Sequence, residues 1–271
     1  MLYMLCRNNF LVMNGSLTHG SVNTAMILAA GLGTRLKPWT DKHPKALALV
    51  NGKSLLQHNI TYLQQFGINR VIVNVHHFAE QVIKALQVNN GWGSEIIISN
   101  ETDEVLETGG GLVKAAPYLQ GSTFVLMNVD ILTDLDLNQL INFHLESSAL
   151  ATLATSQRKT SRYLLFDQYD NLVGWRNTKT GEERPTRKQE GPYIPSVEKA
   201  FSGIHVIDPS IFTLIKRTGK FSMIDVYLDL MTEHRIKCFD HTGCRFIDVG
   251  KPESIQQAEQ MFTPGINEPA I

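Results

Sequence analysis

The first half of the chain alternates short apolar runs with segments whose apolar residues recur at helical spacing. The helical segments are 54–66, 79–86 and 110–119. The apolar runs that predict buried strands are 26–30, 71–75, 95–99 and 123–127. Strands and helices in strict alternation are typical of right-handed βαβ units. The pattern therefore predicts a largely parallel sheet that is covered by helices.

The second half of the chain has a less regular pattern. Helical spacing recurs over 137–145, 209–215 and 224–233. Strand-like segments are 150–156, 163–167, 200–207 and 245–249. A hairpin turn is predicted over 168–174 around Asp170-Asn171, and residues 178–195 predict a long loop because charge, Gly and Pro dominate them without periodicity.

These patterns predict one domain with two flanking segments. The domain spans 25–262, with a first half of about 25–135 and a second half of about 136–262. Residues 1–24 are interpreted as a loosely packed extension and residues 263–271 as a tail. Arg7, Asn8 and Asn9 interrupt the apolar residues of the extension, and no small-residue cleavage site follows, so a secretory signal is not favoured.

Composition and charge narrow the class of protein. With 43% hydrophobic residues among 271, the chain can bury a full core. A net charge of −1 argues against general nucleic-acid binding and a polybasic membrane anchor, and no apolar run reaches the ~20 residues that span a bilayer. Cys6, Cys238 and Cys244 are odd in number and lack metal-ligand spacing. We therefore expect reduced thiols and a cytoplasmic location.

The strongest chemical signal is the loop after the first predicted strand, which reads LAAGLGTRLKP over residues 28–38 and is followed by Pro44-Lys45. Small residues let the backbone approach a ligand, and glycines allow a tight turn that aims N–H groups at phosphates. Arg35 and Lys45 add positive charge where a triphosphate would lie. The loop therefore predicts an anion-binding site.

Two other phosphate-binding motifs fit this loop poorly. The dinucleotide fingerprint has a glycine where this chain has Leu36, and it has an acidic residue after the second strand, where this chain has His76-His77. The P-loop pattern is absent. An ordinary strand-to-turn segment with basic residues by chance is the remaining alternative.

Here the chain resembles the sugar-phosphate nucleotidylyltransferase family, whose fingerprint is L-A-A-G-x-G-T-R-L-x-P followed by P-K. The resemblance covers roughly 25–262, and further blocks match in order: Glu107–Gly111, Asn128-Val129-Asp130, Phe201–Ile204 and Phe246–Glu253. It implies an α/β, three-layer, Rossmann-like (GT-A-like) fold with a predominantly parallel mixed central sheet. In its short length the chain looks most similar to N-acetylmuramate-1-phosphate uridylyltransferases and mannose-1-phosphate guanylyltransferase-like members.

The resemblance also implies roles for individual residues. Arg35, Lys45 and Asp130 would be catalytic, and Asp130 with Asp248 would hold Mg²⁺. The nucleotide would be bound by Leu28, Ala29, Ala30, Gly31, Gly33, Thr34, Arg35, Thr108, Gly109 and Asn128. The sugar phosphate would be bound by Asn74, Glu198, Ser202, Gly203 and Asp225. Asp225 could equally lie in a solvated helix turn.

Some features depart from the family pattern or carry a structural interpretation. Val129 stands where the family usually has a small residue before the metal aspartate. The F-x-E-K-P block, whose lysine meets the sugar phosphate in GDP-mannose enzymes, has no counterpart in 173–177, where Arg176 is the candidate replacement. Asp134 and Asp136 are predicted to cap the helix that follows them.

The resulting hypothesis is an enzyme that condenses a nucleoside triphosphate with a sugar 1-phosphate through Mg²⁺-assisted in-line attack on the α-phosphate. It would act as a monomer or small homo-oligomer, without nucleic-acid or membrane partners. Two alternatives stay open at this point. One is a cytidylyltransferase that acts on a non-sugar phosphate such as phosphocholine, and the other is a regulatory subunit that senses nucleotides with little catalysis.

Overall fold

The computed structural model describes residues 22–184 and 195–263. The predicted extension and tail therefore lie largely outside the described residues, although Val22 is already buried and β1 begins at Thr24. Of the predicted loop over 178–195, residues 182–184 form a strand and residues 185–194 fall outside the description.

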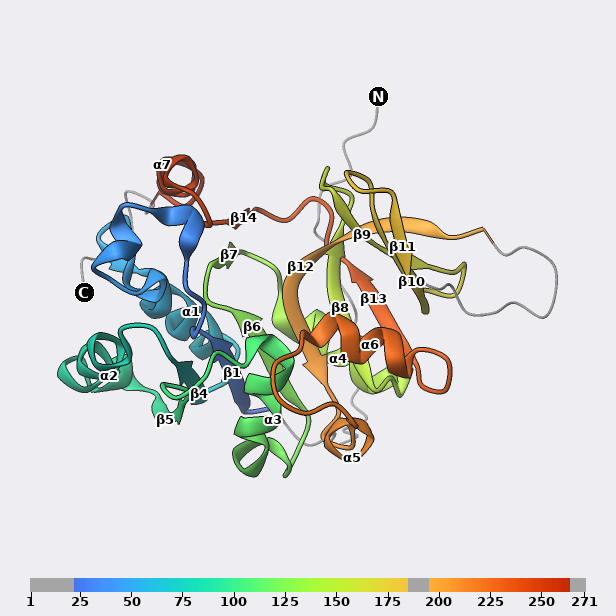
Figure 1. Ribbon diagram of the computed structural model, residues 1–271, viewed down its shortest axis with the longest axis horizontal. Coiled ribbons are helices and arrows are strands. Elements are labelled where there is room, and N and C mark those ends of the chain that lie inside the picture. Colours follow the sequence, from blue (N-terminus) through green and yellow to red (C-terminus); the bar gives the residue numbers. More distant parts are fainter. Residues whose placement is uncertain (1–21, 185–194, 264–271) are drawn as a thin grey trace, which may run out of the picture.

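A mixed sheet runs through the molecule (Figure 1). Within the described residues it has ten strands, eight of them in the order β11-β10-β9-β12-β6-β1-β4-β5, with β8 paired to β12 and β13. The strands of the first half are parallel. They are β1 (Thr24–Leu28), β4 (Arg70–Val75), β5 (Glu95–Asn100) and β6 (Phe124–Asn128).

The second half of the sheet is mostly antiparallel, so the central sheet is mixed, as expected, and parallel only in part. Its strands are β8 (Ala151–Ser156), β9 (Arg162–Phe166), β10 (Leu172–Asn177), β11 (Glu182–Arg184), β12 (Val197–Ile207) and β13 (Ile236–Asp240). Only β8 and β13 pair in parallel there. The reason is the connections: β9, β10 and β11 are joined by short turns, which reverse the chain, whereas parallel neighbours need a long crossover.

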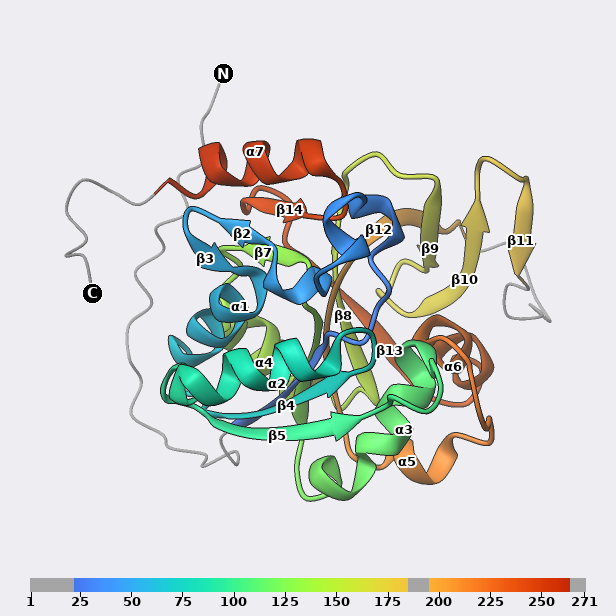
Figure 2. The same ribbon diagram turned by 60° about the vertical axis from the view of Figure 1, so that its left-hand side comes forward.

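Helices cover both faces of the sheet, so the three-layer arrangement is confirmed (Figure 2). On one face lie α1 (Leu55–Gln64), α2 (Ala79–Val88) and α4 (Leu137–Ser147). On the other lie α3 (Glu107–Leu119), α5 (Ile211–Leu214) and α6 (Met223–Leu230). Alternate residues of β1 serve the two cores, since Ala25 and Ile27 belong to the first and Met26 and Leu28 to the second.

Several short elements complete the fold. A small sheet joins β7 (Ile131–Thr133) to β14 (Phe246–Asp248), and another joins β2 (Leu49–Val50) to β3 (Lys53–Ser54). The helix α7 (Pro252–Met261) and the strand β13 are absent from the predicted elements. Short 3-10 helices span Thr34–Leu36, Trp39–Asp41, Lys45–Leu47 and Asn90–Gly93.

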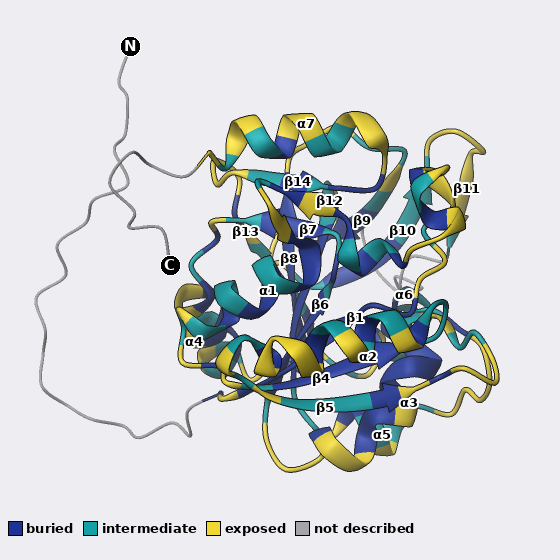
Figure 3. Cartoon of the chain, turned by 90° about the vertical axis from the view of Figure 1, so that its left-hand side faces the viewer, coloured by how far each residue is buried: buried dark blue, intermediate teal, exposed yellow. Residues whose placement is uncertain are grey.

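Burial follows the layers, because the central strands are enclosed while the outer helix faces are exposed (Figure 3). Among the described residues, none of the helices is long and apolar enough to cross a membrane. The parallel strands β1, β4 and β6 all end at one edge of the sheet, and ligands of open α/β sheets bind at that edge.

Candidate active site

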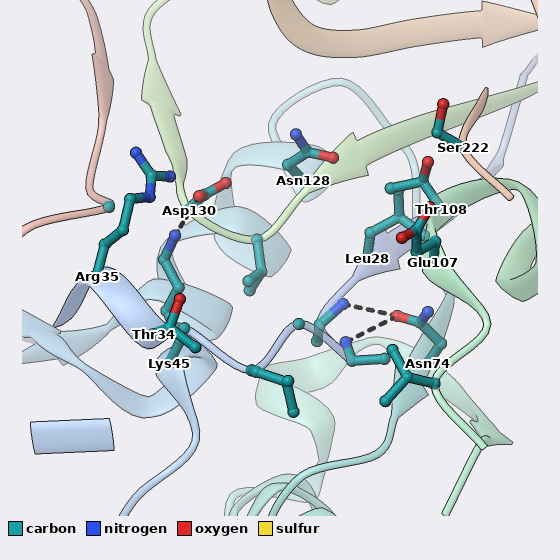
Figure 4. Close-up of a pocket in the computed structure, with 18 of the residues that line it drawn as sticks. Leu28, Thr34, Arg35, Lys45, Asn74, Glu107, Thr108, Asn128, Asp130 and Ser222 are labelled. Carbon is teal, nitrogen blue, oxygen red and sulfur yellow. Dashed lines mark hydrogen bonds and ion pairs between the residues drawn. The ribbon is translucent and has the colours of Figure 1, made fainter. Parts of the chain in front are cut away.

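A cavity of about 490 Å³ opens at the carboxyl ends of β1, β4 and β6 (Figure 4). It gathers most of the residues that the sequence assigns to the nucleotide, together with Lys45, Asn74 and Asp130. The lining residues are Leu28, Ala29, Ala30, Gly31, Leu32, Gly33, Thr34, Arg35, Lys45, Asn74, Val105, Glu107, Thr108, Asn128, Val129, Asp130, Lys220, Ser222 and Gly250. The cavity therefore joins segments from both halves of the chain.

The glycine loop after β1 is shaped by a single obligatory glycine. Gly33 has φ +63°, and a Cβ at that position would lie 2.9 Å from both Lys45 Cβ and Thr40 Cγ2. The Gly33 carbonyl accepts hydrogen bonds from Thr40 Oγ1 (3.0 Å) and from the Leu36 amide (2.8 Å). Leu36, where a dinucleotide motif would have glycine, is instead a buried anchor of the loop.

Asn74 supports the same loop from the end of β4. Its Oδ1 accepts hydrogen bonds from the amides of Ala29 (2.6 Å) and Ala30 (3.3 Å), as the dashed lines in Figure 4 show. Its Nδ2 donates to Glu101 Oε1 at 2.8 Å. The structure therefore places Asn74 beside the glycine loop, away from the second half of the chain that was expected to hold the sugar phosphate. Because its Oδ1 takes both amides, those two N–H groups are not free for a ligand.

Lys45 and Asp130, which both line the cavity, form an ion pair (Figure 4). Their side chains are only 10% and 15% exposed, so solvent screens the pair weakly. Asp130 directly follows Val129, whose amide donates to the Leu28 carbonyl (3.2 Å) and whose carbonyl accepts from Asn59 Nδ2 (2.8 Å). Val129 is 5% exposed and packs in the core, so its size is accommodated there.

Asp248 lies beside Asp130 because β14 pairs with β7. The Val249 amide donates to the Asp130 carbonyl at 2.8 Å, and Arg35 Nη2 lies 3.7 Å from Asp248 Oδ2. Burial raises the pKa of the Asp248 carboxyl, and the neighbouring Asp130 raises it further, while Lys45 and Arg35 lower it. The carboxylates of Asp130 and Asp248 thus lie together with the cationic side chains of Lys45 and Arg35.

These two carboxylates fit a divalent cation. Asp248 Oδ1 is buried and has no hydrogen-bond partner among the described residues, and carboxylate oxygens are the ligands that Mg²⁺ prefers. No group of three or more His, Cys, Asp or Glu side chains with metal-binding geometry occurs in the described part of the chain. Phosphate oxygens and water would have to complete the coordination, which is the usual arrangement for Mg²⁺ at phosphate sites.

The first turn of α3 packs tightly against the segment that precedes α6. The Gly109 amide donates to the Phe221 carbonyl (2.9 Å), and Thr108 Oγ1 accepts from the Met223 amide (2.8 Å). A Cβ at Gly109 would lie 2.4 Å from the Phe221 ring. This packing explains the first two glycines of the E-T-G-G-G block, Gly109 and Gly110, and brings the second segment to the cavity wall.

The sequence-based prediction missed three polar residues of that wall. Glu107 and Lys220 line the cavity, with Glu107 Oε1 3.6 Å from Lys220 Nζ, and Ser222 lines it beside them. Glu107 carried a signal, because it begins the matching block Glu107–Gly111, and Ser222 carried one, because it forms a capping box with Asp225 at the start of α6. Nothing in the local pattern around Lys220 indicated that a loop residue would reach this cavity.

The structure separates the residues expected at the sugar phosphate. Gly203 lies beside Asn128, because a Cβ there would be 2.8 Å from Asn128 Nδ2, and its φ is +74°. Ser202 is 1% exposed and lies 2.7 Å from His241 Nε2 through its Oγ, outside the cavity lining. Glu198 and Asp225 are also outside the lining, each in an ion pair with an arginine.

The two predicted helix caps have different outcomes. Asp136 is confirmed as the N-cap of α4, since its Oδ1 accepts from the Asn138 amide at 2.9 Å. The prediction for Asp134 is wrong. Its carboxylate instead accepts from the Arg245 amide (2.7 Å) and from Arg245 Nε (2.8 Å), which ties the start of β14 to the end of β7.

Known proteins resemble this chain in both sequence and fold. The profile of the Nucleotidyl transferase family matches residues 24–264. The N-acetylmuramate alpha-1-phosphate uridylyltransferase of Neisseria meningitidis is 29% identical over 88% of this chain and 97% of its own length. The mannose-1-phosphate guanylyltransferase catalytic subunit beta of Drosophila melanogaster is 31% identical over 89% of this chain, which covers 63% of that longer protein.

A solved structure agrees with this relationship. HddC from Yersinia pseudotuberculosis, in complex with GMP-PN, superposes with a TM-score of 0.70 at 25% identity, covering 89% of this chain and all of that one. The family match spans almost the whole described region, and the mixed α/β fold is the same. This chain therefore belongs to the Nucleotidyl transferase family, as a member of the sugar-1-phosphate nucleotidylyltransferases.

Proposed function

We propose that this enzyme joins a nucleoside triphosphate to a sugar 1-phosphate with the assistance of Mg²⁺, and that it releases an NDP-sugar and pyrophosphate. The observation that carries the proposal is one cavity in which the glycine loop meets Lys45, Arg35 and two adjacent carboxylates. Such a cavity suits a reaction between two polyanions, because their mutual repulsion must be offset before they can meet.

The nucleotide would lie along the loop after β1. Its phosphates would face the backbone of Gly31–Arg35, with Lys45 toward the α-phosphate. Its base would lie in the part of the cavity bordered by Ala29, Ala30 and Thr108. The amides of Ala29 and Ala30 are occupied by Asn74, so only other backbone atoms of these residues could meet the base.

The chemical step is an in-line displacement at the α-phosphorus. An oxygen of the sugar phosphate attacks that atom, the bond to the oxygen that bridges to the β-phosphate breaks, and pyrophosphate leaves with the electron pair. The nucleophile is already ionised at neutral pH, so no general base is required. Lys45 and Arg35 offset the charge that gathers at the α-phosphate. Mg²⁺ bound by Asp130 and Asp248 would supply further positive charge and orientation.

The relatives suggest where to look for the substrates. The two curated proteins act on N-acetylmuramate 1-phosphate and mannose 1-phosphate, according to their names. The test is a matrix of ATP, CTP, GTP, UTP and dTTP against a panel of sugar 1-phosphates that includes these two, scored by pyrophosphate release. We expect at least one pair to turn over with Mg²⁺ and to lose its activity with EDTA.

Other outcomes of the same matrix would contradict the proposal. Turnover of CTP with phosphocholine alone would point to a non-sugar acceptor. Binding of a nucleotide without pyrophosphate release from any pair would favour a regulatory role.

We further propose that the enzyme works in the reducing conditions of the cytoplasm, in keeping with its three cysteines.

A further inference from the structure

The second half of the sheet contains several cations, and most of them are already neutralised. Arg176 lies 2.6 Å from Glu183 and 2.5 Å from Glu198, and Lys199 forms an ion pair with Asp240. Arg176, the sequence candidate for contact with the sugar phosphate, is therefore held by two carboxylates. Its positive charge is largely compensated before any substrate arrives.

Arg158, just beyond the end of β8, is in a different situation. Its Nη2 donates to the Phe201 carbonyl at 2.7 Å, and its guanidinium lies 5.2 Å from the centroid of the Phe246 ring. Neither contact neutralises the charge. Ion pairs within the described residues engage Arg176, Arg184 and Lys199 in this half of the sheet, but not Arg158.

The two contacts place the Arg158 guanidinium against the strand that carries Asp248, just outside the cavity lining. Phe246 begins β14, and Asp248 ends it two residues later. The negative charge of Asp248 acts on Arg158 and raises its pKa, against a larger lowering by burial. Arg158 therefore contacts the strand that ends in Asp248 from the second half of the chain, whereas Arg35 and Lys45 approach the two carboxylates from the first half.

This position matches a need of the proposed reaction. In an in-line displacement the acceptor phosphate approaches the α-phosphorus from the side opposite the leaving pyrophosphate. The proposed site would hold the triphosphate on the first half of the chain, so the acceptor would come from the second half. A guanidinium is well suited to hold it, because its planar fork can donate two parallel hydrogen bonds to phosphate oxygens.

We propose that Arg158 binds the phosphate group of the sugar 1-phosphate and orients it toward the α-phosphorus. This inference rests on the proposed function. The chain lacks the lysine of an F-x-E-K-P block, and Arg158 would supply the acceptor site with a cation from beyond the end of β8 instead. Arg176 then has a structural role, since it joins β10 to β11 and β12 through Glu183 and Glu198.

The test is steady-state kinetics of Arg158→Met and Arg158→Lys with the best substrate pair from the matrix. Met keeps an apolar stem against Phe246 but removes the charge, so we expect the KM for the sugar 1-phosphate to rise about 10-fold or more. The KM for the nucleoside triphosphate should stay within about 2-fold, which also shows that the variant is folded. Arg158→Lys should recover part of the loss.

The control is Arg162→Met, which removes an exposed arginine from the nearby β9 and should change neither KM. The reverse reaction supplies a second measurement, in which the KM for pyrophosphate should be unaffected by Arg158→Met. A rise in the KM for pyrophosphate or the triphosphate, with an unchanged KM for the sugar 1-phosphate, would overturn the assignment. A wild-type enzyme inactive with the whole matrix would refute the proposed function itself.

Discussion

At the scale of single residues, the candidate site depends on charges that are shielded from solvent. The Lys45–Asp130 pair is largely buried, whereas the Arg35–Asp248 pair is about half exposed. The electrostatic attraction within the buried pair is stronger than that within a surface ion pair, because the surrounding dielectric is lower. The two ion pairs lie next to each other, so neutralising one of the four charges alters the electrostatic potential at the other three.

The first prediction concerns these charges. Lys45→Ala, Arg35→Ala and Asp130→Asn should each lower kcat by about 10²-fold or more, since each removes a charge that would face the reacting phosphates in the proposed site. Pyrophosphate release under saturating substrates measures the effect. Lys84→Ala, an exposed residue on α2, is the control and should keep wild-type turnover. Wild-type rates in all three site variants would exclude this cavity as the active site.

A second prediction concerns Gly111, which lies under the nucleotide loop. A Cβ at this position would lie 2.6 Å from Glu101 Oε1 and 2.9 Å from Asn74 Nδ2. Gly111→Ala should lower the free energy of unfolding by about 1–3 kcal/mol. It should also raise the KM for the triphosphate, because Asn74 holds the loop amides.

Gly121→Ala provides the matched control, since no atom lies within 4 Å of the added Cβ. Urea denaturation should show a change within about 0.5 kcal/mol for this variant. Equal stability of the two alanine variants would contradict the packing argument for Gly111.

At the scale of elements, helix termini position the cavity wall. The first turn of α3 and the segment before α6 are joined by backbone hydrogen bonds through Phe221 and by Thr108 Oγ1. The capping box of Ser222 and Asp225 then sets where α6 begins. In the same way, the pairing of β7 with β14 brings Asp248 to Asp130, although they are far apart in the sequence. Contacts between element ends thus decide which side chains meet.

The third prediction tests a cap that lies outside the cavity lining. Asp136→Ala removes the hydrogen bond that the Asn138 amide donates to Asp136 Oδ1 at the start of α4. It should lower the free energy of unfolding by about 1 kcal/mol and leave kcat unchanged. Asn138→Ala, at the exposed neighbouring position, should stay within about 0.5 kcal/mol of the wild type. A loss of stability as large in Asn138→Ala would argue against the cap.

At the scale of the whole molecule, the two apolar cores enclose histidines as neutral groups. Burial lowers the pKa of His205 to about 3 and that of His144 to about 4, from an ordinary value of 6.5. His205 Nδ1 lies 2.6 Å from the Tyr227 hydroxyl, and His144 Nδ1 lies 3.0 Å from Thr152 Oγ1. Both rings are thus part of the packing between the sheet and its helices.

The fourth prediction follows from these depressed pKa values. Between pH 6.5 and about 4 the unfolded chain binds protons at both histidines and the folded chain does not. Stability is therefore fully present above pH 6.5 and falls as the pH drops, by about 1.4 kcal/mol per pH unit for each histidine. His144→Gln should show a shallower loss than the wild type between pH 7 and pH 5 in denaturant titrations. An identical slope in both proteins would disprove this contribution.

Much of the first half of the fold was predictable from the sequence, because its elements are encoded locally. The buried strands are apolar runs, the helices carry apolar residues at helical spacing, and the glycine loop needs small residues at fixed positions. The family relationship was predictable for the same reason, since LAAGLGTRLKP is a continuous motif. Asp136 was recognised as a cap because a cap depends only on its own helix.

The sequence by itself thus determined the fold class, the nucleotide loop and the identity of the charged residues Arg35, Lys45, Asp130 and Asp248. Only the tertiary structure decided that the second half of the sheet is mostly antiparallel, that Asn74 holds the loop amides, and that Arg176 is neutralised while Arg158 is not. The physical reason is the distance along the sequence over which each kind of interaction acts. Periodicity and turn chemistry act over a few residues, whereas strand order and side-chain partners depend on contacts between distant segments, which no local pattern records.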